Sequence, residues 1–197
     1  MKSIYDFQIK SKEEFEIVQD KSKKDPEVFW SEVAGVFKWN SVWDKVLESD
    51  WTIPRTKWFI NGKLNITENC LDVHAKSTPD KLAILWEPND PNADSQRITY
   101  EELLSKVCKF SNGLKSLGVK KGDSICLYMP MVPELTVAVL ACARIGAIHS
   151  VVFAGFSSKA LSARINDSKC RILITADGAF RGNKIICLLY TSDAADE

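Results

Sequence analysis

The sequence has little of what metal and redox sites require. No glycine-rich G-x-G motif occurs among its nine glycines, which argues against a nicotinamide-binding βαβ unit and against a phosphate loop of the Walker type. Two histidines, His74 and His149, are all that could join the cysteines in a zinc site. The six cysteines form no C-x-x-C pair and stand at positions 70, 108, 126, 142, 170 and 187. The residues therefore predict no metal centre.

An excess of charge of either sign is also missing. The 26 lysines and arginines balance 26 aspartates and glutamates, so no basic field favours nucleic acid or an anionic membrane. The amino terminus, MKSIYDFQIKSKEEF, has no apolar stretch of signal-peptide length. The apolar region from Met129 to Phe153 is interrupted by Pro133, Glu134 and Arg144, whereas a spanning helix needs about 20 nearly uncharged residues. We expect a cytoplasmic protein with reduced thiols and with neither nucleic acid nor a membrane as partner.

Hydrophobic residues make up 45% of the chain, which is enough for a packed fold. Near the amino terminus, Ser11 with Glu14 fits a capping box, and Asp25 before Pro26 fits the start of a second helix. Two short helices are predicted before residue 37, and Asn61-Gly62 is typical of a hairpin turn. All the tryptophans fall in the first half of the chain, at positions 30, 39, 43, 51, 58 and 86.

From Leu82 onward, short apolar runs alternate with helical patterns. The runs LAILWE, SICLYM, HSVVFA and RILITAD are suited to buried strands. Thr99 begins the first helix between them, Pro133 the second and Ser157 the third. The first of these helices should end at Gly118, and its apolar face should consist of Leu103, Val107, Phe110, Leu114 and Leu117.

This alternation predicts an α/β fold, a parallel doubly wound sheet with flanking helices, preceded by a tryptophan-rich helical and irregular lead segment. Ligands of such sheets gather at the carboxyl ends of the strands. We therefore expect any binding site in the loops that follow the strands.

Two segments, YMPMVPELTVAVLACARIGAIHSVVFAGFS and ITADGAFRGNK, are similar to the opening of the adenylating domain of AMP-forming acetyl-CoA synthetases. The similarity continues upstream through DPEVFW, WDKVL, KWFINGKLNITENCLD and ITYEELLSKVCKF. It implies an incomplete N-terminal adenylating domain of the AMP-binding superfamily. The expected segments are a polar helical lead at 1–24, the synthetase N-terminal segment at 25–80, the truncated start of the AMP-binding domain at 81–186 and a foreign tail at 187–197.

The last eleven residues, CLLYTSDAADE, depart from the family's pattern. They resemble the translation of a transposase adapter used in sequencing libraries. We therefore expect this tail to make few contacts with the core and to leave Tyr190 exposed. A divergent carboxyl terminus is the alternative.

The resemblance implies a ligase that transfers AMP from ATP to acetate, after which CoA displaces AMP to give acetyl-CoA. ATP, CoA and Mg²⁺ are the implied cofactors, and acetate, ATP and CoA the implied small-molecule partners. The family's phosphate loop, acetate pocket and catalytic lysine lie beyond position 197, so we expect no catalytic residue here and no adenylate or thioester formation by this polypeptide alone.

Activation of propionate or acetoacetate is a sister hypothesis. A non-catalytic α/β binding module and a nicotinamide-dependent oxidoreductase are hypotheses of other classes.

Within this chain the resemblance assigns only a surface for CoA. A basic loop would contact the nucleotide phosphates, because arginine can donate two hydrogen bonds to one phosphate and lysine supplies a point charge. A second loop would form a wall beside the adenine. The residues so assigned are Arg181, Gly182, Asn183 and Lys184 in the basic loop, and Phe153, Ala154 and Gly155 in the wall. From the residues alone, Arg181 and Lys184 fit better as solvated charges, and His149 as a hydrogen-bonded core residue.

Overall fold

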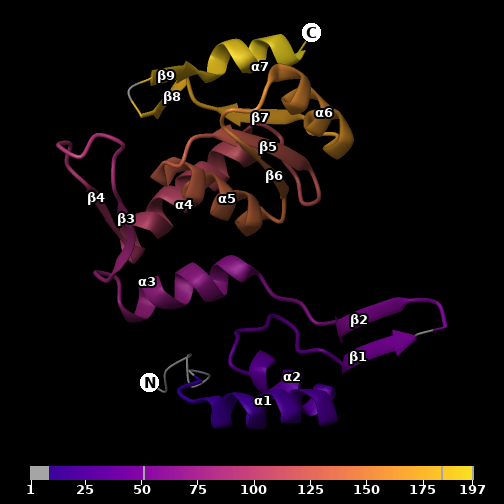
Figure 1. Cartoon of the computed structure of the whole chain (residues 1–197). Helices are drawn as coiled ribbons and strands as arrows, with labels where there is room; N and C mark the ends of the chain where they lie inside the picture. Colours follow the sequence, from indigo (N-terminus) through magenta and orange to yellow (C-terminus); the bar gives the residue numbers. More distant parts are fainter. Residues whose placement is uncertain (1–8, 51, 183, 197) are drawn as a thin grey trace. The chain divides into compact units, whose positions relative to one another are not determined.

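The computed structural model describes residues 9–50, 52–182 and 184–196. The chain divides into two compact units, one ending at Asn65 and the other beginning at Ile66 (Figure 1). The predicted boundary between residues 80 and 81 stays a prediction. Among the described helices, none has the length and apolar character needed to cross a membrane.

The first unit begins with the two predicted helices, α1 (Lys12–Lys24) and α2 (Pro26–Ala34). The Ser11 side chain accepts a hydrogen bond from the Glu14 N–H, and the Asp25 side chain accepts one from the Val28 N–H. Each cap satisfies a backbone donor that the first helical turn leaves without an intrahelical partner. The two predicted helix starts are confirmed. The predicted capping box at Ser11 is only half formed, because the Glu14 carboxylate accepts a hydrogen bond from the Lys10 N–H at 2.6 Å.

A hairpin of β1 (Lys45–Asp50) and β2 (Arg55–Ile60) completes the first unit. The Asp50 carboxylate accepts hydrogen bonds from the backbone N–H and the hydroxyl of Thr52, at 2.9 and 2.6 Å, and so fixes the turn between the strands. The prediction of a hairpin turn at Asn61-Gly62 is wrong. Ser41 bridges Lys63 beyond that pair, so Asn61-Gly62 interrupts an antiparallel ladder that continues past it.

The second unit opens with a π-helical turn, η1 (Glu68–Asp72), and the short helix α3 (Val73–Ser77). The strands β3 (Leu82–Trp86) and β4 (Gln96–Thr99) follow and pair antiparallel. The prediction that LAILWE belongs to the parallel sheet is therefore wrong. The strand that follows in sequence supplies its partner instead, and an irregularity between Leu82 and Ile84 shifts the register.

A three-stranded parallel sheet forms the centre of this unit, in the order β6 (Ile148–Phe153), β5 (Ser124–Met129) and β7 (Ile172–Thr175). Helices α4 (Tyr100–Ser116), α5 (Pro133–Ile145) and α6 (Ser158–Ser168) alternate with the strands. The alternation and the α/β fold class are thus confirmed, although the parallel sheet has one strand fewer than the four predicted.

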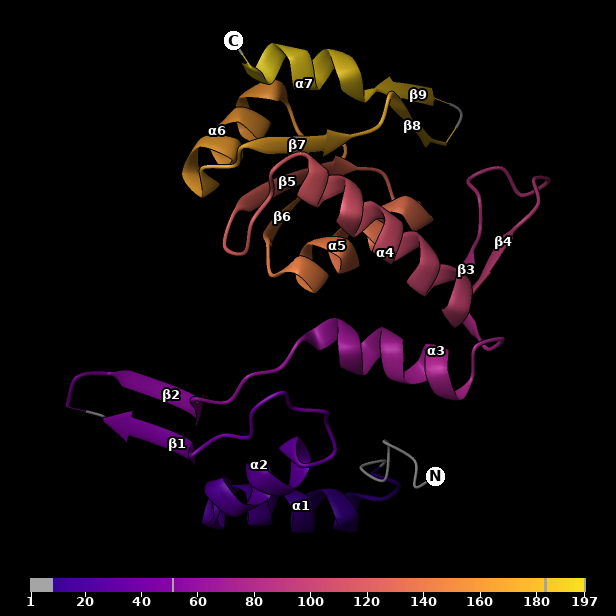
Figure 2. The ribbon, with the colours of Figure 1, turned by 180° about the vertical axis from the view of Figure 1, so that it is seen from behind.

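The central strand β5 has both faces buried. Ile125 and Leu127 join the core under α4 and α5, whereas Cys126 and Tyr128 join a second core with Leu161 of α6. This division follows from the two-residue period of a strand, which sends successive side chains to opposite faces. Figures 1 and 2 show α4 and α5 on one side of the sheet and α6 on the other.

Helix α4 follows the predicted pattern with one exception. Thr99 and Glu102 form the complete capping box, and Gly118 ends the helix region with φ of +84°. Leu103, Val107 and Leu114 are buried and Phe110 packs against them, but Leu117 is 70% exposed. Leu117 occupies the C-cap position, where the chain leaves the helical path, so its side chain no longer follows the apolar face.

The chain continues through the antiparallel strands β8 (Gly178–Arg181) and β9 (Lys184–Cys187) into α7 (Leu188–Asp196). Tyr190 is 78% exposed, as predicted. The prediction of few core contacts is wrong, because Leu188 is fully buried in the core that contains Leu161. The Leu188 N–H also donates to the Asp177 carbonyl at 3.0 Å. The foreign origin of residues 187–197 stays a prediction.

Candidate functional site

The carboxyl ends of the three parallel strands bring separate loops to one edge of the sheet. Strand β5 ends at Met129, β6 at Phe153 and β7 at Thr175. Of the predicted wall residues, Phe153 ends β6, and Ala154 and Gly155 follow in the next loop. The predicted basic loop lies one short strand beyond β7. This edge is where doubly wound sheets bind ligands.

The loop after β6 presents an aromatic surface. Phe153 is 58% exposed, and its ring packs edge-on against that of Phe156 with 6.0 Å between centroids. Ala154 turns inward and packs against the core around Tyr128. Gly155 has φ of +153°, and a Cβ there would lie 3.2 Å from Cε1 of Phe153, so a larger residue would crowd the exposed ring.

The predicted basic loop is the turn between β8 and β9. Arg181 pairs with Lys184 across the hairpin, and Gly182 between them has φ of +58°, a conformation that glycine adopts without a steric penalty. Lys184 is exposed. Asn183 and the side chain of Arg181 lie outside the described residues.

One buried core connects the two predicted segments. Ala154 of the wall packs against this core, and so do Ala179 and Ile186, which flank the turn of the basic loop. The structure therefore anchors the wall and the base of the β8–β9 hairpin on the same group of side chains. Sequence reasoning placed these segments together only by resemblance, because no local pattern links positions 154 and 179.

The β3–β4 hairpin supplies two contacts that sequence reasoning missed. Trp86 Nε1 donates to the Met131 carbonyl at 2.8 Å, and Asn89 Nδ2 donates to the Gly182 carbonyl at 2.9 Å. Each bond ties this hairpin to a loop at the carboxyl edge. The sequence separations of 45 and 93 residues explain why neither contact could be predicted from local pattern.

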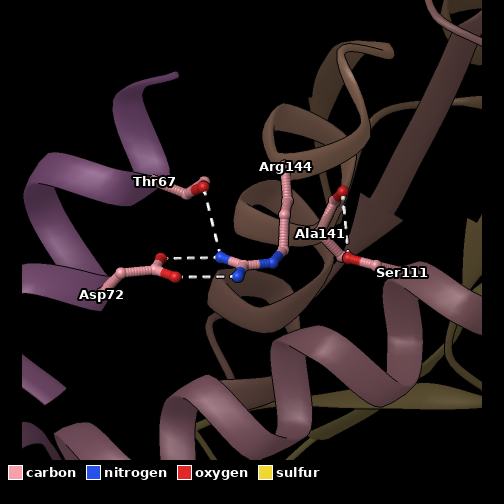
Figure 3. A network of polar contacts seen from close by, with 5 residues as sticks. All are labelled: Thr67, Asp72, Ser111, Ala141 and Arg144. Atoms are coloured by element: carbon pink, nitrogen blue, oxygen red, sulfur yellow. Dashed lines mark hydrogen bonds and ion pairs between the residues drawn. The ribbon is translucent and has the colours of Figure 1, made fainter. Parts of the chain in front are cut away.

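A polar network holds the start of the unit against α5 (Figure 3). Arg144 donates to both carboxylate oxygens of Asp72, at 2.7 and 2.8 Å, and to the Thr67 hydroxyl at 3.5 Å. The hydrogen bond to Asp72 raises the pKa of the Arg144 guanidinium. The geometry is the two-pronged arrangement in which arginine binds a carboxylate most strongly. The network joins η1 and the preceding Thr67 to α5.

The remaining reactive side chains belong to the core. Burial raises the pKa of the Cys126 and Cys142 thiols to about 11, so both stay protonated at neutral pH. His149 lies within β6 and is half-buried. No group of three metal-ligating side chains gathers in the part of the chain that the structure describes.

A separate groove of about 700 Å³ lies between α4 and α5. Phe110 and Leu114 of α4 line it together with Leu117 just after that helix, and so do Val137 of α5 and Ile174 of β7. Its lining is mainly apolar, with Lys106, Lys109 and Glu134 also present, and it contains none of the predicted site residues.

Comparison with known proteins gives two family matches. Residues 71–195 match the AMP-binding enzyme family, and residues 15–70 match the acetyl-coenzyme A synthetase N-terminus. An acetyl-coenzyme A synthetase of Bdellovibrio bacteriovorus is 49% identical over 182 residues, or 92% of this chain and 28% of that protein. One of Magnetococcus marinus is 51% identical over 186 residues, or 94% of this chain and 29% of that protein.

A solved structure gives a match of the fold as well. The acetoacetyl-CoA synthetase from Streptomyces lividans superposes with a TM-score of 0.83 at 26% identity, over 89% of this chain and 27% of that one. The present chain thus spans less than a third of the length of each of these three relatives.

Proposed function

The chain belongs to the AMP-binding enzyme family, and from this we propose that it serves as the amino-terminal part of an AMP-forming acetate–CoA ligase. The observation that carries the proposal is the 49% identity to an acetyl-coenzyme A synthetase over 92% of the chain. In such a ligase the acetate oxygen attacks the α-phosphorus of ATP and pyrophosphate leaves. The CoA sulfur then attacks the acetyl carbon and AMP leaves.

In this ligase the carboxyl edge of the sheet contributes to the CoA site. The exposed ring of Phe153, with Ala154 and Gly155, forms the wall beside the adenine. Arg181 and Lys184 supply positive charge for the nucleotide phosphates, and Gly182 allows the turn between them. The proposal draws support from the exposure of Phe153 and Lys184 and from the core that anchors both segments.

ATP and Mg²⁺ are proposed as cofactors of the whole ligase. Among the described residues no three carboxylate, thiol or imidazole groups gather, and the sequence has no G-x-G motif for phosphates. We therefore propose that the residues that hold ATP and Mg²⁺ lie in another part of the ligase. That this polypeptide alone does not form the adenylate stays a prediction.

Acetate is favoured over acetoacetate as the acyl substrate. The two relatives named acetyl-coenzyme A synthetase are 49% and 51% identical to the chain, whereas the acetoacetyl-CoA synthetase is 26% identical. A cytoplasmic location is part of the same proposal, and the six free cysteines fit a reducing compartment.

The test is a substitution in the full-length ligase that contains these residues. Arg181→Ala should raise the KM for CoA roughly 10-fold or more, because a charge-assisted hydrogen bond contributes about 1.5 to 3 kcal/mol. The KM values for ATP and acetate should stay unchanged. Lys115→Ala, which removes an exposed positive charge at the end of α4, is the matched control and should leave all three values unchanged. An unaltered KM for CoA in the Arg181→Ala enzyme would overturn the CoA assignment.

A further inference from the structure

The loop after β6 is tied to the body of the protein through Phe156. The Phe156 N–H donates to the Phe153 carbonyl at 3.1 Å, which closes a tight turn over Ala154 and Gly155. The Phe156 ring packs edge-on against the Phe153 ring, with 6.0 Å between the centroids. The position of Phe156 therefore limits where the exposed Phe153 ring can lie.

Tyr128 holds Phe156 from inside the sheet. Its hydroxyl donates to the Phe156 carbonyl at 3.0 Å, across 28 residues of sequence. Tyr128 is fully buried in β5, the central strand, and it is the largest of the fully buried side chains. Because close packing restricts its ring, the hydroxyl is a fixed donor rather than an adaptable one.

Arg164 of α6 contacts the Phe156 ring. The guanidinium carbon lies 4.5 Å from the ring centroid, within the range of a cation–π contact. The guanidinium also donates to the Ala160 carbonyl at 2.9 Å, which restrains it on its helix. Phe156 is thus restrained at its carbonyl and at its ring by two different elements.

We propose that Tyr128 is a positioning residue for the CoA site, and that it acts through Phe156 to hold the Phe153–Gly155 wall in the geometry that receives the adenine. This inference rests on the proposed function. Tyr128 itself would not touch CoA, because its side chain is buried. Loss of its hydroxyl alone would leave the shared core and the phosphate-binding charges in place and would release the Phe156 carbonyl.

The experiment is calorimetric titration with CoA of the full-length ligase that contains these residues and of its Tyr128→Phe variant. Removal of one hydrogen bond should weaken CoA binding about fivefold. The variant should weaken binding of 3′-phosphoadenosine 5′-diphosphate, the nucleotide half of CoA, by the same factor. Arg164→Gln, which keeps a donor but removes the charge over the ring, is a second variant and should act in the same direction.

Ser111→Ala is the matched control. The Ser111 hydroxyl is also buried and also donates to a backbone carbonyl, that of Ala141, at 3.3 Å (Figure 3). It lies between α4 and α5, away from the wall. Thermal unfolding measures the loss of stability in Tyr128→Phe and in Ser111→Ala. Ser111→Ala should lose about as much stability as Tyr128→Phe but should leave the affinity for CoA unchanged.

The outcomes separate the inference from the proposed function. If the parent ligase binds CoA and Tyr128→Phe binds it equally well, or if Ser111→Ala weakens binding as much, the positioning role is overturned while the CoA site stands. If the parent ligase does not bind CoA, both fall. A selective loss with Tyr128→Phe supports the inference.

Discussion

At the scale of single residues, the pair of Arg144 and Asp72 shows how far a contact can reach in sequence. The side chains are 26% and 31% exposed, so water screens the charges only in part. Both nitrogens of the guanidinium fork are used, which makes this pair stronger than an ordinary surface ion pair. Asp72 lies at the end of η1, and the pair links that turn to α5.

Asp72→Asn should lower the free energy of unfolding by about 1 kcal/mol, a value that includes a discount for solvent screening. Urea denaturation followed by circular dichroism measures the change. Asp94→Asn, at an exposed position in the loop between β3 and β4, removes the same charge and should have little effect. Equal losses in the two variants would mean that the pair contributes no more than a solvated carboxylate.

The sequence predicts contacts between residues close in the chain, but it did not predict the pair of Arg144 and Asp72. The bond between Thr99 and the Glu102 N–H spans three residues, so the order of the residues predicts it. The bonds from Arg144 to Asp72, Trp86 to Met131 and Asn89 to Gly182 span 45 to 93 residues. Such partners depend on the completed fold, and no short pattern specifies them.

The buried Cys142 thiol gives a prediction about pH. Burial raises its pKa from 9.0 to about 11, so the thiol loses its proton at lower pH in the unfolded chain than in the native one. Its contribution to stability is therefore complete below pH 9 and is lost as the pH rises toward 11. Urea denaturation across this range should show a shallower decline for Cys142→Ala than for the parent chain. Identical slopes would contradict the account.

At the scale of elements, helix ends were the most predictable features. Pro133 and Ser157 begin α5 and α6 where their sequence patterns indicate, because capping depends on a few adjacent residues. Strand pairing was less predictable. LAILWE has the composition of a buried parallel strand, yet β3 pairs antiparallel with β4, a strand that ends at Thr99, the residue predicted to begin the next helix. Composition indicates a strand but does not determine its neighbour.

Two glycines of neighbouring helices provide a matched pair of substitutions. Gly113 lies within α4 and a Cβ there would meet nothing within 4 Å, so Gly113→Ala should raise the free energy of unfolding by about 0.5 to 1 kcal/mol. Gly146 ends α5 with φ of +74°, and a Cβ there would lie 2.9 Å from Cγ of Lys121. Gly146→Ala should lower the free energy by about 1 kcal/mol or more.

Chemical denaturation of both variants tests this pair. The two changes in the free energy of unfolding should have opposite signs. The added methyl group lowers the conformational entropy of the unfolded chain at position 113, whereas it strains the left-handed backbone at position 146. A gain of stability in Gly146→Ala would contradict the left-handed helix end.

At the scale of the whole molecule, the alternation of strand and helix patterns predicted the fold class, but it did not identify the residues of the site. Alternating strands and helices predict a parallel sheet and place ligands at its carboxyl edge. Which loop residues bind, and what they bind, came from resemblance to acetyl-CoA synthetases. Phe153, Ala154 and Gly155 carry no motif that would identify them without that resemblance. Tyr128 and Arg164 hold the neighbouring Phe156, but in the sequence they look like an ordinary core residue and an ordinary surface residue.

The central claim is that the carboxyl edge of this sheet carries part of a CoA site. Titration of the ¹⁵N-labelled 197-residue chain with CoA, followed by amide resonances in NMR spectra, tests it most directly. The account predicts saturable shifts at Phe153, Ala154, Gly155 and Lys184. No saturable shift, or shifts confined to the apolar groove between α4 and α5, would contradict it.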